Sequence, residues 1–144
     1  MKIYIGTDHV GFELKNKLIE YINKLGHQVE DVGAFTFDVN DDYPDFITPV
    51  AQAVSIDEDS MGIVLGGSGQ GEAICANKIN SIRAIVYYGG NIEIPKLGRE
   101  HNNANILSLG ARFITEDEAK EAVCVFLSTN FSNDERHVRR LNKF

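Results

Sequence analysis

Short apolar runs alternate with longer segments of helical periodicity along the whole chain. The apolar runs are typical of buried strands and lie at residues 2–5, 28–32, 61–65, 84–86 and 105–109. The segments between them predict helices at residues 14–25, 44–54, about 72–78, 92–101 and 115–127, with a short helix in the tail at 133–144. This alternation favours an α/β fold with a five-stranded parallel sheet that is covered on both faces.

Glycine, proline and small polar residues predict several helix ends. Gly26 predicts the end of the first helix, as the residue that follows its C-cap. Thr115 precedes three acidic residues and predicts an N-cap. Pro44 suits a first helical turn, whereas Pro49 in the same segment predicts that this helix starts late or kinks. The segment 92–101 is expected to be helical despite Pro95.

A glycine-rich loop, GGSGQG at residues 66–71, directly follows the strand at 61–65. Such a loop turns free backbone N–H groups toward one point, where they can hold an oxyanion or a phosphate. The loop is not a P-loop, because no Lys-Ser/Thr pair follows a glycine. It is not a dinucleotide-binding fingerprint either, because the spacing of its glycines and its place after the third strand differ from that motif. A nucleophile elbow would need glycine where Gln70 stands. We interpret the loop as a donor cradle; the alternative is a tight turn without function.

Glu72 stands where this loop becomes a helix. A carboxylate there complements the helix dipole, which explains it without function. The adjacent cradle favours a catalytic role, since aldose–ketose isomerisation needs a base beside donors for an enediolate oxygen. His101, at an expected helix end, is either a cap or a proton shuttle.

Ligands of parallel sheets bind beyond the carboxyl ends of the strands. This rule groups Asp8 and His9 after the first strand, the glycine loop after the third, and Arg112 after the fifth. Asp8 could also act only as a helix N-cap. Arg136 and Arg140 share a helix face at i, i+4, so they form either a phosphate clamp or a solvated helix end.

Length and charge narrow the function classes. The 144 residues favour one domain, residues 1–144, and the net charge of -7 argues against nucleic-acid and anionic-membrane partners. No apolar run approaches the ~20 residues of a membrane span, and the first residues enter a strand without a signal peptide. We expect Cys75 and Cys124 to be free thiols, and the protein to be cytoplasmic.

Motifs along nearly the whole chain, in order, resemble the type-B ribose-5-phosphate isomerases, a group that includes the galactose-6-phosphate isomerase subunits. The matching motifs are Gly6-x-Asp8-His9-x-Gly11-Phe12-x-Leu14-Lys15, Asp42-Tyr43-Pro44-Asp45, Gly67-Ser68-Gly69-Gln70-Gly71, Ala76-Asn77-Lys78, Arg99-Glu100-His101-Asn102, Leu109-Gly110-Ala111-Arg112 and Arg136-His137-x-x-Arg140. The resemblance implies a Rossmann-like three-layer sandwich that forms homodimers or homotetramers. It implies active sites at the subunit interface, with no cofactor and no metal.

The resemblance also implies roles for individual residues. Many members place a catalytic cysteine where this chain has Gly66, whereas another branch uses a glutamate that Glu72 matches. Glu72 is then the base, and His101 opens the sugar ring. The implied substrate-binding residues are Asp8, His9, Gly67, Ser68, Gly69, Gln70, Gly71, Asn102, Arg112, Arg136 and Arg140. His101, Asn102 and Arg112 are expected from the partner subunit, on which the tail 133–144 is expected to pack.

The function expected on this basis is interconversion of ribose 5-phosphate and ribulose 5-phosphate through an enediolate. A competing possibility is isomerisation of a six-carbon sugar phosphate, such as allose or galactose 6-phosphate. The segment from Tyr87 to Gly98 departs from the plain helix usual in the family, and it leaves the sugar length open. A non-catalytic sugar-phosphate-binding protein and a structural partner subunit are the two remaining possibilities.

Overall fold

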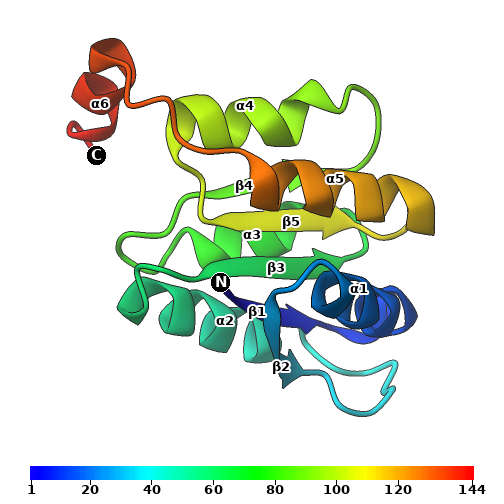
Figure 1. The fold of residues 1–144 in the computed structure, drawn as a ribbon. Helices are drawn as coiled ribbons and strands as arrows, with labels where there is room; N and C mark the ends of the chain where they lie inside the picture. The colour runs from blue at the N-terminus through cyan, green and yellow to red at the C-terminus, as the bar shows by residue number, and fades with distance from the viewer.

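A parallel sheet of five strands forms the centre of the molecule (Figure 1). The computed structural model describes all 144 residues. The strands are β1 (Lys2–Thr7), β2 (Gln28–Gly33), β3 (Met61–Gly66), β4 (Ala84–Tyr87) and β5 (Ile106–Gly110). Their order across the sheet is β2-β1-β3-β5-β4, and every neighbouring pair is parallel. The predicted α/β fold with a five-stranded parallel sheet is therefore confirmed.

Helices cover both faces of this sheet and complete three layers. The helices are η1 (His9–Gly11), α1 (Phe12–Lys24), α2 (Pro44–Ile56), α3 (Gln70–Ala76), α4 (Glu93–Asn102), α5 (Glu116–Ser128) and α6 (Glu135–Leu141). Leu18 of α1 and Phe126 of α5 are buried in one core with Ile63 of β3. Val50 of α2 is buried in a second core with Val64 of β3. Successive residues of one strand thus face opposite cores, as the strand period of two requires.

Most helix boundaries agree with the sequence. Gly26 has φ +87° after α1 ends at Lys24, and Thr115 caps α5 in a capping box with Glu118. Pro49 lies inside α2, but the helix begins at Pro44, so the predicted late start is wrong. Proline at the first helical position loses no intrahelical hydrogen bond, and the buried face of α2 holds the rest of the helix on the sheet.

Helix α6 and the glycine loop lie at opposite ends of the sheet. The arrows of β3 and β5 in Figure 1 point away from α6, which stands beyond the amino ends of the strands. The glycine loop after β3 lies at the opposite, carboxyl end. None of the helices combines the length and the hydrophobicity that a membrane span requires.

The loop between β2 and α2 is fixed at its start by a buried lysine. Lys15 is fully buried, and its Nζ donates to the Asp31 carboxylate at 2.6 and 2.8 Å and to the Ala34 carbonyl at 2.7 Å. The Ala34 amide donates to the Thr7 carbonyl at 2.8 Å. These contacts hold the start of the loop beside the end of β1.

Candidate active site

The glycine loop is fixed by hydrogen bonds to the end of β5. Ser108 donates its hydroxyl to the Gly69 carbonyl at 2.7 Å, and the Ala111 amide donates to the Gly66 carbonyl at 2.8 Å. Gly69 has φ +77°, and a Cβ there would lie 3.1 Å from the backbone of Leu109. The amide N–H groups of Gly67 and Ser68 donate to no other backbone group. The loop therefore offers donors to an anionic oxygen.

Glu72 lies in the first turn of α3 and is 4% exposed. Burial raises the pKa of its carboxyl group, the negative charge of Asp8 raises it further, and the backbone amides of Glu72 and Gly69 oppose the shift. A Cβ atom built at Gly66 would overlap the Glu72 carboxylate. The carboxylate is thus folded back over the end of β3, beside the donor loop. A carboxylate with a raised pKa is suited to accept a proton near neutral pH.

A cavity of about 350 Å³ opens at this point. It is lined by residues from three strand ends and from the loop before α2: Asp8, His9, Val10, Tyr43, Gly67, Ser68, Gly71, Glu72, Arg112 and Phe113. The grouping predicted from the carboxyl ends of the first, third and fifth strands is therefore confirmed. Gly69 is instead turned against β5, and Gln70 is exposed outside the cavity. Their contacts with substrate stay predictions.

Arg112 belongs to the cavity of its own chain. Its amide donates to the Gly67 carbonyl at 3.1 Å, and its guanidinium lies 3.3 Å from where a Cβ of Gly67 would stand. This position differs from the expectation that a partner subunit supplies Arg112. The rule that ligands bind beyond the carboxyl ends of the strands predicts this position correctly. Arg112 follows β5, and the glycine loop follows β3, the strand that pairs with β5.

Two further side chains of the cavity are fixed at the end of β1. Asp8 is 7% exposed, and its carboxylate accepts the Val10 amide at 3.0 Å, so it caps the short helix η1. His9 contacts Asp41, whose Oδ1 lies 2.6 Å from the ring Nδ1. Asp8, His9 and Asp41 lie close enough to share a metal ion. The 2.6 Å separation is that of a hydrogen-bonded pair, which an ion would have to replace.

The remaining predicted residues gather at the other end of the sheet. His101 and Asn102 are in the last turn of α4, and Arg136 and Arg140 are on α6. The His101 ring stacks on His137 of α6, with centroids 4.3 Å apart and planes 13° apart. None of these residues lines the cavity that contains Glu72. Each chain thus carries two separate groups of predicted site residues, one at each end of the sheet.

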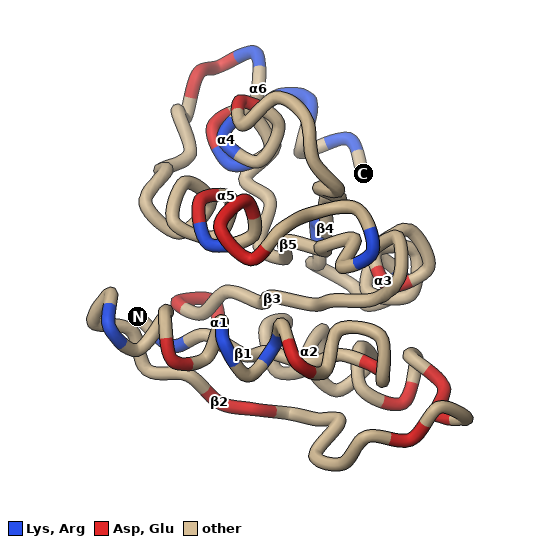
Figure 2. Tube along the Cα trace, turned by 90° about the vertical axis from the view of Figure 1, so that its right-hand side faces the viewer, with Lys and Arg blue, Asp and Glu red and all other residues tan.

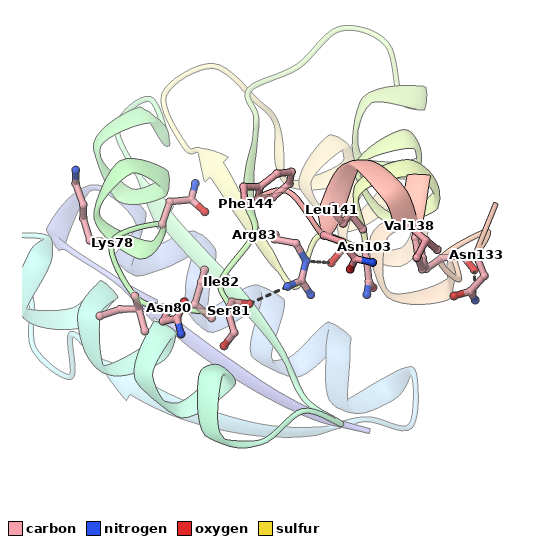
Figure 3. Close-up of a pocket in the computed structure, with 14 residues that line it drawn as sticks. Lys78, Asn80, Ser81, Ile82, Arg83, Asn103, Asn133, Val138, Leu141 and Phe144 are labelled. Atoms are coloured by element: carbon pink, nitrogen blue, oxygen red, sulfur yellow. Dashed lines mark hydrogen bonds between the residues drawn. The ribbon is translucent and has the colours of Figure 1, made fainter. Parts of the chain in front are cut away.

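A cavity of about 800 Å³ lies beside the second group (Figure 3). Figure 3 shows Arg83 and Asn103 between the loop that follows α3 and the helix α6, with Val138 and Leu141 on the α6 side. Arg83 donates to the backbone carbonyls of Asn103 and Ser81. The cavity is lined mainly by asparagines and apolar side chains, with Lys78, Ser81 and Arg83 but no carboxylate side chain, so its size does not make it the catalytic site.

Tyr43 is a cavity residue that the sequence reasoning did not assign to the site. Its ring packs on Gly71, where an added Cβ would lie 2.9 Å from the phenol oxygen. The signal was present, because Tyr43 belongs to the motif Asp42-Tyr43-Pro44-Asp45. Asp41 was also missed, since it lies in an irregular loop whose path the sequence does not specify.

Comparison with known proteins identifies the family of this chain. Residues 3–144 match the model of the ribose/galactose isomerase family. The chain is 45% identical over 142 residues to ribose-5-phosphate isomerase B of Mycolicibacterium paratuberculosis, a match that covers 99% of this chain and 88% of the relative. It is 39% identical to a probable ribose-5-phosphate isomerase B of Mycoplasma genitalium, covering 98% of this chain and 91% of the relative.

Solved structures give the same result. The crystal structure of ribose-5-phosphate isomerase B from Mycoplasma genitalium with bound ribulose-5-phosphate superposes with a TM-score of 0.94 at 38% identity, covering 99% of this chain and 92% of that one. Ribose-5-phosphate isomerase B of Clostridium thermocellum gives 0.92 at 42% identity, covering 99% and 94%. The chain therefore belongs to the ribose/galactose isomerase family, among its type-B ribose-5-phosphate isomerases.

Proposed function

We propose that this protein interconverts ribose 5-phosphate and ribulose 5-phosphate, with Glu72 as the base. Glu72 removes the proton from C2 of the open-chain aldose and returns it to C1. The amides of the loop at residues 67–71 hold the oxygen that becomes negative in the enediolate. The observation that carries this proposal is the buried Glu72 carboxylate beside the donor loop, in one cavity with Asp8, His9 and Arg112.

The active unit in this proposal is a homodimer, or a homotetramer built from such dimers. A chain holds the base at the carboxyl end of its sheet, while His101, Asn102, Arg136 and Arg140 lie at the other end. A symmetric pair of chains can bring the first group of one copy to the second group of the other, twice per dimer. His101 then opens the ring, Asn102 contacts a hydroxyl group, and Arg136 and Arg140 bind phosphate.

The distribution of charge supports this pairing. Figure 2 shows Lys and Arg along α6 and the C-terminal end, whereas β2 and the loop after it carry Asp and Glu. Arg136 has one acidic neighbour, Asp134, at 3.8 Å. Arg139 and Arg140 form no ion pair within the chain, and Arg140 is exposed. Free guanidinium groups on a C-terminal helix that packs on a partner could meet the phosphate there.

The pentose is favoured over a six-carbon sugar by the relatives, which are ribose-5-phosphate isomerases by name.

Location in the cytoplasm is part of the proposal. It rests on two cysteines, Cys75 and Cys124, that form no disulfide.

An NMR assay of aldose phosphates in deuterium oxide tests the proposed reaction. Ribose 5-phosphate is expected to give ribulose 5-phosphate that carries deuterium at C1 wherever the proton held by Glu72 exchanges with solvent before its return, while allose 6-phosphate and free ribose react far more slowly. The Glu72→Gln variant is the matched control, because it keeps the shape of the side chain and removes the base. Conversion of ribose 5-phosphate by this variant at the wild-type rate would contradict the proposal.

A further inference from the structure

The His9 side chain is held by a residue 32 positions away. Asp41, on the loop between β2 and α2, accepts two hydrogen bonds at the same Oδ1 atom. One comes from the His9 backbone amide at 3.1 Å, and the other joins the His9 ring Nδ1 at 2.6 Å. The carboxylate therefore fixes both the backbone and the ring of His9.

Burial of the Asp41 carboxylate at this position is energetically unfavourable. Its side chain is only 10% exposed, and its second oxygen, Oδ2, is buried without a hydrogen-bond partner. A buried carboxylate destabilises a fold unless its partners compensate. His9 is the only residue whose side chain bonds to the Asp41 carboxylate. The side chain that this carboxylate orients is therefore that of His9.

Other contacts also anchor the loop that carries Asp41. Lys15 already holds the start of the loop through the Asp31 carboxylate and the Ala34 carbonyl. The Asp41 amide closes a turn with the Asp38 carbonyl at 3.1 Å. The bond from Asp41 to the imidazole ring is additional to these structural contacts.

The consequence of the contact is chemical. When Nδ1–H donates to a carboxylate, the proton of the neutral ring is fixed on Nδ1 and the other nitrogen, Nε2, is left for another partner. His9 lines the cavity of Glu72 and Arg112, and no protein group bonds to its Nε2. The Phe37 ring makes a T-shaped contact with the imidazole, with centroids 6.2 Å apart, and is a second side-chain contact of His9.

We propose that Asp41 is a positioning residue that fixes the tautomer and orientation of His9, so that the unprotonated Nε2 accepts a hydrogen bond from a hydroxyl group of the bound sugar phosphate. This inference rests on the proposed function, in which His9 contacts the substrate. Asp41 does not touch the substrate in this arrangement and acts through His9 alone.

A set of variants tests this inference. Asp41→Ala should lower kcat/KM by ~10-fold or more. This is the scale of the effect when a residue that orients a metal-binding histidine is lost. Asp41→Asn, which keeps an acceptor oxygen, should retain more activity. The matched control is Asp38→Ala in the same loop, since the Asp38 side chain is exposed and bonds only to the Asn40 amide. This control should behave as the wild type does.

Two further measurements separate positioning from a purely structural role. In a His9→Ala background, Asp41→Ala should have no additional effect beyond ~2-fold, because residues that act as a unit are not additive. The ¹⁵N NMR signals of His9 should place the proton on Nδ1 in the wild type and distribute it over both nitrogens in Asp41→Ala. An equal loss of activity in both backgrounds, or a proton on Nε2 in the wild type, would overturn the inference.

The experiment also separates failure of this inference from failure of the proposed function. If His9→Ala keeps wild-type activity while Glu72→Gln is inactive, the Asp41 inference is overturned and the Glu72 mechanism stands. If Glu72→Gln is active, the proposed mechanism fails, whatever the state of His9.

Discussion

The carboxylate of Glu72 occupies the space that a side chain at Gly66 would need. Gly66 is the last residue of β3, and Glu72 is in the first turn of α3, so the two are joined only by the short loop between them. This contact accounts for a glycine at the position where many members of the family carry a cysteine. A residue with a side chain at position 66 and a carboxylate in this position exclude each other.

Gly66→Ala is predicted to displace the Glu72 carboxylate and to lower kcat. Overpacking of this kind costs about 1–3 kcal/mol of stability. The cost should be smaller in a Glu72→Ala background, where the space is empty. Chemical unfolding of the two single variants and the double variant measures the difference. An equal cost in both backgrounds would show that the Glu72 carboxylate does not lie against Gly66 in solution.

Glu72→Gln is predicted to lower kcat by about 100-fold or more, since it removes a general base and keeps the shape of the side chain. Binding of a phosphate-bearing ligand should persist, because Arg112 and the loop amides remain. Steady-state kinetics and calorimetric titration with a sugar-acid phosphate measure these two quantities. Cys75→Ala and Cys124→Ala are the controls, and both should keep wild-type kcat.

The pKa of Glu72 is raised. The acid limb of the pH dependence of kcat should therefore lie above the pKa of an ordinary glutamate, which is ~4.3. A folded-state pKa above the unfolded value means that the folded protein binds this proton more tightly. The ionised carboxylate then destabilises the fold at neutral pH, and the effect vanishes as pH falls below the unfolded pKa. Glu72→Gln should therefore be more stable than the wild type at neutral pH, with a difference that shrinks in acid.

Carbon NMR titration of the Glu72 carboxyl group checks the direction of this shift, with Glu72→Gln providing the assignment. A midpoint at or below the ordinary glutamate value would show that the carboxylate is solvated rather than buried. Unfolding free energies of both proteins, measured across the same pH range, provide an independent check.

Arg136→Ala and Arg140→Ala are predicted to raise KM for ribose 5-phosphate by about tenfold or more each, because a charge-assisted bond contributes ~1.5–3 kcal/mol. Remote binding energy can also lower the barrier, so kcat is expected to fall as well. Arg139→Ala is the matched control, since Arg139 lies on the same helix and carries the same charge. Equal effects of all three changes would indicate a general loss of positive charge instead of a phosphate site.

The sequence predicted local features more reliably than the contacts between distant segments. The N-cap at Thr115 and the stop at Gly26 depend on neighbouring residues, and both are confirmed. The carboxyl-end rule placed Arg112 with the glycine loop, since it needs only the strand sequence and parallel pairing. Sequence patterns alone predict these features because each depends on a few adjacent positions.

Contacts made by irregular or charged segments could not be predicted in this way. Lys15 has the sequence context of a surface lysine on an amphipathic helix, yet it is fully buried on Asp31. The contact of His9 with Asp41 depends on the path of a loop that has no periodicity. The stacking of His101 on a histidine of the tail depends on how α6 returns to α4. Each of these contacts arises from tertiary structure, which local propensity does not encode.

Complementation between two inactive variants tests the shared-site dimer most directly. Glu72→Gln removes the base from one end of each chain, and His101→Ala removes the ring-opening group from the other end. After subunit exchange, roughly half of the dimers are mixed and each mixed dimer has one intact site of two, so activity should return to roughly a quarter of the wild-type value. Absence of recovery after verified exchange, or full activity in a monomeric fraction, would contradict the shared-site dimer.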